Sequence, residues 1–558
     1  KNLNDEIDQY DHQLGKWLYR YQSNQWQRLI AISEFIHWSS DRYRTYCNSS
    51  ITSIEFECRL DKFCRYWSDV QRLFGGDGNG HRQSSNDIQF EFNHQKQTLT
   101  HQIEQIGIVY RGHQYRCDES IDLLMEKLQN SNEILKIWQE CHQQLEYHMI
   151  PDLFEKIRKQ ISGKYFYELW NKVNYDLKIG SIDQIRLKAW TLWNRLKPFY
   201  HLLMDYIGHR LREKFNDDDD DNFEQIPAHW LRSLNGAQMD TIIDLIRPYS
   251  FGEQHPNDNQ INDVIEIVSR FYVEHGGFDP LPEQFWQQSN LIQQSNNGSC
   301  HPQTLNMYNN NDVRMNICLQ SNNFHYNFRR LFHELGHVYY FFQSNHHHRN
   351  LYQMQFNSAS HESIGELMRM TWNGCQLHSQ RSILPKSLFN QLRINTLMEE
   401  ALSTLVTIPF GLILEEWRNQ TFSTTDNQMT LDDSNDHKSL DDHQQILDPL
   451  LKYHVANFQP YWRYVFGVLL QHQFHRKICH NHHSLVECCP RPTDFDPLRK
   501  LLRIDLMQPE FSGNDLDIMV KMFDSNDIDY QIEPLLEYYQ PLIDWLGEWK
   551  QQQQQRQN

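Results

Sequence analysis

Apolar residues recur at helical spacing along most of this chain. Ile121, Leu124, Met125 and Leu128 repeat at intervals of three and four residues, which places them on one face of a helix. Similar runs cover 191–213, 391–418, 461–478 and 531–549. Glycine (22) and proline (18) together make up about 7% of the 558 residues, against about 12% in an average chain. The sequence therefore predicts a mostly α-helical protein with few turns.

Composition narrows the class of protein further. Hydrophobic residues make up 39% of the chain, which excludes wholesale disorder, a collagen-like chain and a coiled-coil rod. The net charge of −19 argues against nucleic acid as the main partner, because phosphate binding needs a basic surface. Three polar segments (75–80, 217–221 and 423–443) are typical of exposed loops, and none separates independent blocks. We expect one large domain over 1–558, with a frayed low-complexity tail at 551–558.

Several features indicate a compartment outside the cell. The chain begins at Lys1 without a signal peptide and has no apolar run of the roughly 20 residues that span a bilayer. It contains 11 cysteines, an odd number that leaves at least one thiol unpaired or paired with another chain. Three glycosylation sequons start at Asn48, Asn297 and Asn419. We therefore expect a secreted glycoprotein, whose oligomeric state the sequence leaves open.

The most specific local signal is His333-Glu334-Leu335-Gly336-His337. On a helix, residues i and i+4 share a face, so both imidazoles can bind one Zn²⁺ while Glu334 takes a proton from water beside it.

A second acidic cluster follows 25 residues later and completes the pattern. Glu362, on the next predicted helix, would give two histidines and one carboxylate, which is the ligand set of a catalytic zinc with an open fourth position. Glu366 lies one turn further and would hold a ligand histidine in place. The sequence thus predicts a hydrolytic zinc centre.

These residues resemble the zinc site of the angiotensin-converting enzyme family of peptidyl-dipeptidases. The resemblance extends to several other motifs in the same order along the chain. They are Ile226–His229, Cys300-His301 with Cys318, Lys452–His454, Pro460–Tyr464, Gln473–His475 with Cys479, and Pro541–Leu546. The similarity spans nearly the whole chain and is weakest over the first 110 residues. It implies a single mostly α-helical domain of two lobes with a deep central active-site cleft.

The resemblance also implies a role for each matching residue. Glu334 would be the general base, and Tyr464, helped by His454, would donate to the oxyanion of the tetrahedral species. His301 and His454 would hold the substrate backbone, and Lys452 with Tyr461 would bind the free C-terminal carboxylate. A cation at a fixed distance from the metal would select the release of dipeptides from short peptides. Further roles implied are chloride binding by Arg463 with Tyr206, and disulfides Cys300–Cys318 and Cys479–Cys488.

Some positions depart from the family pattern. Residues 355–360, just before Glu362, differ from the family segment, which leaves the position of this ligand open. Asp258, with Gln260 nearby, stands where a glutamine normally assists the carboxylate-binding lysine. Thr407 and Val468 replace aromatic residues of the pocket that receives the leaving dipeptide, which implies a changed side-chain preference. A second chloride site in the family has one arginine where Gln420 stands and another near Asn171, so that site is expected to be missing.

Two other functions stay open. One branch of the family removes a single C-terminal residue and places a cation where the dipeptidases keep glutamine, and the 258–260 region shows no such cation. A catalytically silent homologue could instead act as a secreted binding protein. The presence of Glu334 and Tyr464 together argues against this second alternative.

Overall fold

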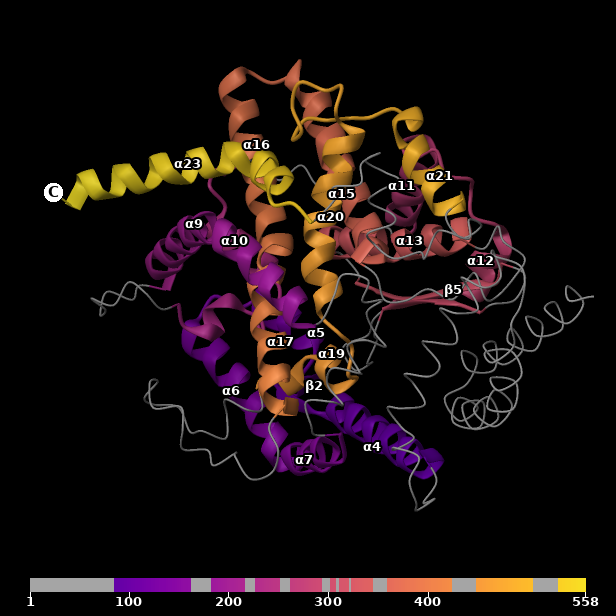
Figure 1. The fold of residues 1–558 in the computed structure, drawn as a ribbon. Coiled ribbons are helices and arrows are strands. Elements are labelled where there is room, and N and C mark those ends of the chain that lie inside the picture. Colours follow the sequence, from indigo (N-terminus) through magenta and orange to yellow (C-terminus); the bar gives the residue numbers. More distant parts are fainter. Residues whose placement is uncertain are drawn as a thin grey trace, which may run out of the picture.

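The computed structural model describes residues 85–161, 182–215, 226–250, 261–293, 302–307, 311–320, 323–344, 359–423, 448–504 and 530–557. Helices dominate these residues, which confirms the predicted mostly α-helical class (Figure 1). The deep cleft between two lobes stays a prediction.

The first half of the described chain contains mainly helices and one β-hairpin. Its long helices are α4 (Ser85–Gln105), α6 (Ser131–Tyr147), α7 (Ile150–Ile161), α9 (Ile182–Phe215) and α11 (Ile261–Glu274). Its shorter elements are β1 (Gly107–Tyr110), β2 (His113–Arg116), α5 (Glu119–Glu126), η2 (Ala228–Leu231), η3 (Asp240–Ile242), α10 (Ile243–Ile246) and α12 (Glu283–Gln288).

The second half carries the helices that build the centre of the molecule. They are α13 (Phe324–Ser344), α15 (Ala359–Arg381), α16 (Lys386–Glu400), α17 (Thr407–Ser423), α20 (Trp462–Ile478) and α23 (Glu533–Gln557). Shorter elements are the π-helical turn η4 (Ala401–Leu405), η5 (Asp448–Leu451), α19 (Tyr453–Ala456), η6 (Pro492–Phe495) and α21 (Asp496–Ile504). Helix α15 packs against both α13 and α20, and its inward face is buried (Figure 1).

A small mixed sheet lies beside α13. Strands β3 (Asn290–Gln293), β4 (Gln303–Asn306) and β5 (Val313–Leu319) are arranged in the order β3-β5-β4, with β5 parallel to β3 and antiparallel to β4. The sequence shows no strand pattern here, because strands of four residues are too short to give a clear alternation. The sheet nevertheless contributes to the site, since β4 and β5 both pack on α13.

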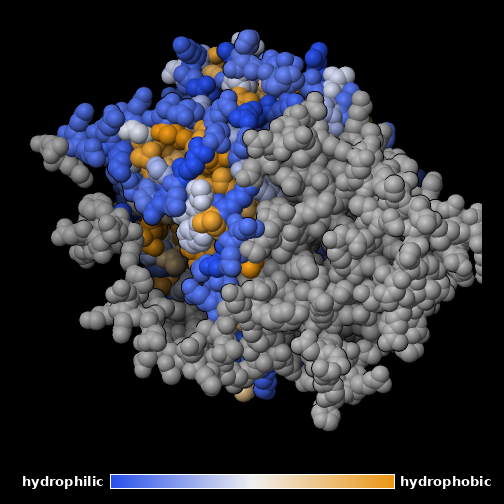
Figure 2. Space-filling view, in the orientation of Figure 1, coloured by the Kyte–Doolittle hydropathy of each residue, from blue (hydrophilic) through white to orange (hydrophobic). Residues whose placement is uncertain are grey.

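The C-terminal helix α23 contains the motif Pro541–Leu546 and continues to Gln557. Residues 551–557 are therefore helical, in contrast to the frayed tail that low complexity predicts. Glutamine is a good helix former, so a repeat of glutamines extends a helix that packing has already started. Hydrophobic residues show on the molecular face where α23 lies near α9 and α10, within a mainly hydrophilic described surface (Figure 2).

One stretch, Lys386–Phe422, is long and apolar enough by composition to cross a membrane. It comprises α16, η4 and most of α17, and most of its apolar window is buried within the protein. The same composition is typical of a central core helix in a globular protein.

Candidate metal centre and active site

Two glycines allow α13 and α15 to cross at backbone contact. A Cβ on Gly336 would lie 2.4 Å from the Cα of Gly365, and a Cβ on Gly365 would lie 2.6 Å from the Cα of His333. Neither position has room for a side chain, so the crossing needs glycine on both helices. Helix α20 approaches from the other side, where a Cβ on Gly467 would lie 3.2 Å from the Cβ of Glu362. The crossing thus brings Glu362 up to the two histidines of α13.

The three predicted metal ligands converge on one point. The Nε2 atoms of His333 and His337 are 3.0 Å apart, and Glu362 Oε2 lies 3.7 Å from each. Ligand atoms about 2.0–2.1 Å from a tetrahedral zinc lie about 3.3–3.4 Å from one another, so these separations bracket the required value. Glu362 Oε2 is buried and accepts no hydrogen bond from the described residues. A buried acceptor left without a donor fits a carboxylate oxygen that binds a cation.

Glu366 orients the first histidine. Its Oε1 lies 3.4 Å from His333 Nδ1, and Arg369 donates a 2.9 Å hydrogen bond to its Oε2. Burial opposes the charge of Glu366, but the Arg369 guanidinium and His333 hold the pKa of this carboxyl below its usual range. An ionised Glu366 keeps the proton of His333 on Nδ1 and points Nε2 toward the metal position.

The surroundings shift the pKa values of His333 and His337 in opposite directions. Burial disfavours the charge on His333, yet Glu366, Glu362 and Glu334 raise its pKa to about 9. Burial and the neighbouring His361 lower the pKa of His337. The rings of His337 and His361 stack with centroids 4.1 Å apart. A cation entering the site would therefore displace a proton from His333 and meet His337 already neutral.

Glu334 lies on the same turn of α13 with its carboxylate held by the sheet. Thr304 on β4 donates a 2.8 Å hydrogen bond to Glu334 Oε2. Glu334 is 5% exposed, and burial raises the pKa of its carboxyl. A raised pKa makes the carboxylate a better proton acceptor, as a general base requires.

Helix α20 and the short α19 bring the predicted oxyanion donor to this site. The hydroxyl of Tyr464 lies 3.0 Å from His454 Nε2 and accepts a 2.9 Å hydrogen bond from Arg463 Nη2. Burial raises the pKa of the Tyr464 hydroxyl, which therefore keeps its proton. The Nε of Arg463 lies 3.3 Å from Glu362 Oε1, so one guanidinium links the ligand carboxylate to the tyrosine.

The structure gives Arg463 and Tyr206 different surroundings. The Tyr206 hydroxyl donates a 2.7 Å hydrogen bond to the Ile246 carbonyl, and its ring packs on Trp545 and Trp549 of α23. Burial raises the pKa of this hydroxyl to about 12. The contacts of Arg463 with Glu362 and Tyr464 differ from these, and the shared chloride site of Arg463 and Tyr206 stays a prediction.

Lys452 and Tyr461 lie on the segment between η5 and α20. Lys452 directly precedes α19, and burial lowers the pKa of its ammonium to about 8, partly opposed by the carboxylate of Asp122. The ring of Tyr461 packs on those of Tyr464 and His454, with centroids 4.7 and 5.7 Å away.

The backbone of this segment is anchored by a buried ion pair. Glu415 on α17 accepts a hydrogen bond from the Tyr461 N–H, and Arg418 bonds both Glu415 and the His454 carbonyl. Glu415 and Arg418 are almost fully buried. This pair fixes where the side chains of His454 and Tyr461 project.

One further cation of this region, Arg330, is not among the residues that the sequence predicts for the site. Arg330 lies one turn before Glu334 on α13, stacks over Tyr326, and is half-buried. Burial lowers the pKa of its guanidinium to about 10, while the charges of Glu334 and Asp118 act in the opposite sense. The signal was present in the sequence, because Arg330 and Glu334 have helical i, i+4 spacing.

The disulfides agree with the sequence in part. Cys479 and Cys488 are joined, as the resemblance implies, and Cys318 is also disulfide-bonded. Cys117 pairs with Cys141, and a further bridge joins Cys375 to Cys489.

Other predicted positions lie outside the described residues. They are Cys300, His301, Asn48, Asn297, Asn171, Asp258, Gln260 and the segment 355–358. The third sequon begins at Asn419, which is half-buried within α17. A helical, half-buried asparagine is a poor glycan acceptor, since such acceptors lie in surface loops. Of the two pocket positions, Thr407 begins α17 and Val468 is buried on α20.

Comparison with known proteins extends the local geometry to the whole chain. The family model Peptidase_M2, described as angiotensin-converting enzyme, matches residues 7–557. An angiotensin-converting enzyme-related protein of Drosophila melanogaster is 24% identical over 471 residues, which is 77% of this chain and 72% of the relative.

Two relatives named angiotensin-converting enzyme show similar identity. That of Mesocricetus auratus is 26% identical over 64% of this chain, and that of Theromyzon tessulatum is 25% identical over 63%. These matches cover 28% and 59% of the respective relatives. The family match over nearly the whole length shows that this chain belongs to the angiotensin-converting enzyme family of metallopeptidases.

Proposed function

We propose that this protein is a secreted zinc peptidyl-dipeptidase, which releases dipeptides from the C-termini of short peptides. The observation that carries the proposal is the convergence of His333, His337 and Glu362 beside Glu334 and Tyr464. Zinc suits two imidazoles and a carboxylate, and this ligand set leaves a fourth position for water or substrate. Bound there, zinc would polarise the scissile carbonyl and acidify a water molecule.

Glu334 moves the proton in this proposal. Its carboxylate accepts a proton from the attacking water and then delivers it to the nitrogen of the leaving dipeptide. The hydrogen bond from Thr304 to Oε2 fixes one oxygen, which leaves Oε1 to face the water. The raised pKa of Glu334 favours accepting the proton, and proton transfer by a positioned group typically contributes 10²–10⁴-fold.

Tyr464 stabilises the charge that develops on the carbonyl oxygen. Its hydroxyl is held between His454 and Arg463 and stays protonated, so it is aligned to donate before the reaction starts. A donor fixed in advance needs no reorganisation when the oxyanion forms. Arg463 also lies against Glu362, which couples the tyrosine to the ligand carboxylate.

Lys452 and Tyr461 provide the proposed grip on the C-terminal carboxylate. Both come from the segment that Glu415 and Arg418 anchor, so their distance from α13 is fixed by buried contacts. A lysine with a lowered pKa is desolvated, which strengthens its attraction to a substrate carboxylate. His301 would bind the substrate backbone, and a chloride beside Arg463 would act on the same tyrosine.

Secretion is supported by the disulfides of the described region. Disulfides persist in oxidising compartments and are rare in the cytosol. The described residues contain the disulfides Cys117–Cys141, Cys375–Cys489 and Cys479–Cys488.

Arg330 favours a second candidate, the removal of single residues. This cation is one helical turn from the general base, and its charge is felt by Glu334. A cation closer to the metal than the lysine of a dipeptidase would select the release of one residue, and Arg330 is the candidate for that role. The catalytically silent alternative rests on the altered segment 355–360 before Glu362, most of which lies outside the described residues.

Mass spectrometry of peptide products separates these functions. The substrates are a tripeptide blocked at its N-terminus and a peptide of nine or ten residues, each with the protein alone, with a zinc chelator, and with zinc restored. Loss of C-terminal dipeptides that stops with the chelator and returns with zinc supports the main proposal. Loss of single residues supports the carboxypeptidase, and an Arg330→Gln variant then reports whether this cation selects them. A folded, zinc-loaded protein that cleaves neither peptide contradicts both enzymatic readings.

A further inference from the structure

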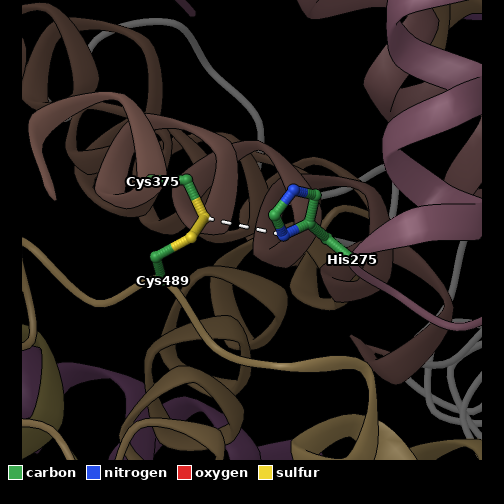
Figure 3. Close-up of side chains that lie close together, drawn as sticks. All are labelled: His275, Cys375 and Cys489. Atoms are coloured by element: carbon green, nitrogen blue, oxygen red, sulfur yellow. Dashed lines mark hydrogen bonds between the residues drawn. A yellow bond between two sulfur atoms is a disulfide. The ribbon is translucent and has the colours of Figure 1, made fainter. Parts of the chain in front are cut away.

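A disulfide and a histidine meet at the end of α15 that is far from the metal ligands. Cys375 and Cys489 are bonded to each other, and His275 Nδ1 lies 3.9 Å from the sulfur of Cys375 (Figure 3). The ring of His275 stacks on Phe271, with centroids 4.6 Å apart, which turns its Nδ1 edge toward the sulfur. The two sulfurs and one ring nitrogen lie within 4.8 Å of one another.

The three residues come from three separate parts of the chain. His275 directly follows α11, Cys375 lies on α15, and Cys489 lies in the loop after α20. This loop contacts α15 at the backbone level, because a Cβ on Gly374 would lie 2.2 Å from the carbonyl oxygen of Cys488. The cluster is therefore held by packing that does not depend on the disulfide alone.

We propose that Cys375, Cys489 and His275 form a second metal site, specific for a soft divalent cation such as Zn²⁺ or Cd²⁺, when the disulfide is reduced. Two thiolates and an imidazole are the ligands such ions prefer. With metal–sulfur distances of about 2.3 Å and metal–nitrogen distances of about 2.0–2.1 Å, the sulfur and nitrogen atoms lie about 3.6 Å apart. The observed 3.9 Å is already near this value. His275 and Cys489 are partly exposed, so a water molecule can take the fourth position.

A dithiol supplies the reduction. Its two sulfurs form a new disulfide with each other, and two electrons and two protons pass to Cys375 and Cys489 as their bond breaks. The cation then binds the two thiolates, and both thiol protons leave to solvent. Under oxidising conditions the disulfide persists and the site does not exist, so the two forms are alternatives.

The molecule contains a matched cluster that should behave differently. His475, Cys479 and Cys488 have the same ligand types, and His475 Nε2 lies 3.5 Å from the sulfur of Cys479. All three are buried, and both cysteines are 0% exposed. A dithiol in solution therefore reaches Cys375–Cys489 before Cys479–Cys488, and the second cluster serves as an internal control.

The test uses the zinc-loaded full chain under native conditions. The protein is treated with limiting dithiothreitol, alkylated, and mapped by mass spectrometry to identify which cysteines became thiols. A parallel sample is titrated with Cd²⁺, and binding is followed by the ultraviolet band of thiolate-to-cadmium charge transfer. This band arises only from sulfur ligands, so the His333–His337–Glu362 centre does not contribute. The variants are His275→Gln and, as the matched control, His475→Gln.

The expected result is reduction of Cys375 and Cys489 first, followed by binding of one Cd²⁺ that the oxidised protein does not bind. His275→Gln should weaken this binding about tenfold or more, because one of three protein ligands is lost, while His475→Gln should leave it unchanged. Circular dichroism of each variant checks folding. If a variant fails to fold, the comparison of reduced with oxidised wild type decides the question. Prior reduction of Cys479–Cys488, absence of a charge-transfer band after Cys375 and Cys489 are free thiols, or equal binding by His275→Gln would each overturn the proposal.

Discussion

Replacing Gly336 by alanine should separate the two helices that carry the metal ligands. The new Cβ would lie 2.4 Å from both the Cα and the N of Gly365, whereas ordinary contacts begin at 3.4 Å. Relieving this contact needs a displacement of about 1 Å. Overpacking of this kind costs about 1–3 kcal/mol. This cost exceeds the gain of about 0.5–1 kcal/mol that alanine brings to a helix interior.

The displacement acts directly on the metal centre. Metal–ligand distances tolerate only about ±0.2 Å, so moving Glu362 away from His333 and His337 should weaken zinc binding. A misplacement of about 1 Å at a catalytic site costs about 10²-fold in rate. We therefore expect Gly336→Ala to bind zinc more weakly, to unfold at a lower temperature and to lose about 10²-fold in kcat/KM.

A glycine elsewhere in a helix provides the control. A Cβ on Gly547 of α23 would meet no atom within 4 Å, so Gly547→Ala should be neutral or stabilising by up to about 1 kcal/mol. The assays are thermal unfolding of the metal-free protein, chelator competition for zinc, and peptide cleavage. Wild-type zinc affinity and wild-type unfolding temperature in Gly336→Ala would refute the backbone-contact account of the crossing.

Three further outcomes follow from the site and its surroundings. Glu334→Gln should retain zinc but lose about 10²–10⁴-fold in kcat, and equal activity of variant and wild type would exclude this residue as the base. Tyr464→Phe should lower kcat by about 10²–10³-fold with little change in KM, and a change in KM alone would exclude the oxyanion role. Burial lowers the pKa of His472 to about 4 and of His475 to about 3, so below pH 6.5 the unfolded chain binds more protons than the folded one. The free energy of unfolding should therefore fall by about 1.4 kcal/mol per pH unit for each histidine as pH drops from about 6.5 toward 4. Denaturant titrations at several pH values should show that the free energy of unfolding of His472→Phe depends less steeply on pH, by the contribution of one histidine. An unchanged dependence on pH would contradict this assignment.

The sequence predicts those parts of the site that depend on local geometry. His333 and His337 share a helical face by spacing alone, and Glu366 lies one turn from Glu362 for the same reason. The position of Glu362 beside the histidines depends on how two helices cross. The glycines that permit this crossing, Gly336 and Gly365, are visible in the sequence, but which backbone each one meets is a tertiary fact.

Most of the contacts that the sequence does not predict join residues that are far apart along the chain. Arg463 lies against Glu362, which is 101 positions earlier in the chain, while chloride binding by Arg463 stays a prediction. The Cys375–Cys489 bridge spans 114 positions, and eleven cysteines allow too many pairings to select it without coordinates. Arg330 differs, since its i, i+4 spacing from Glu334 is visible in the sequence, and only the structure shows that its charge acts on Glu334.

Metal analysis of the oxidised full chain measures whether His333, His337 and Glu362 bind zinc. Zinc would be counted per chain after dialysis against a weak chelator, in the wild type and in Glu362→Gln, with circular dichroism to confirm that both are folded. The convergence of two helices on one cation predicts one zinc ion per wild-type chain and loss of that ion from the folded variant. A folded wild type without zinc, or a variant that retains it fully, would contradict the assignment of His333, His337 and Glu362 as the metal centre.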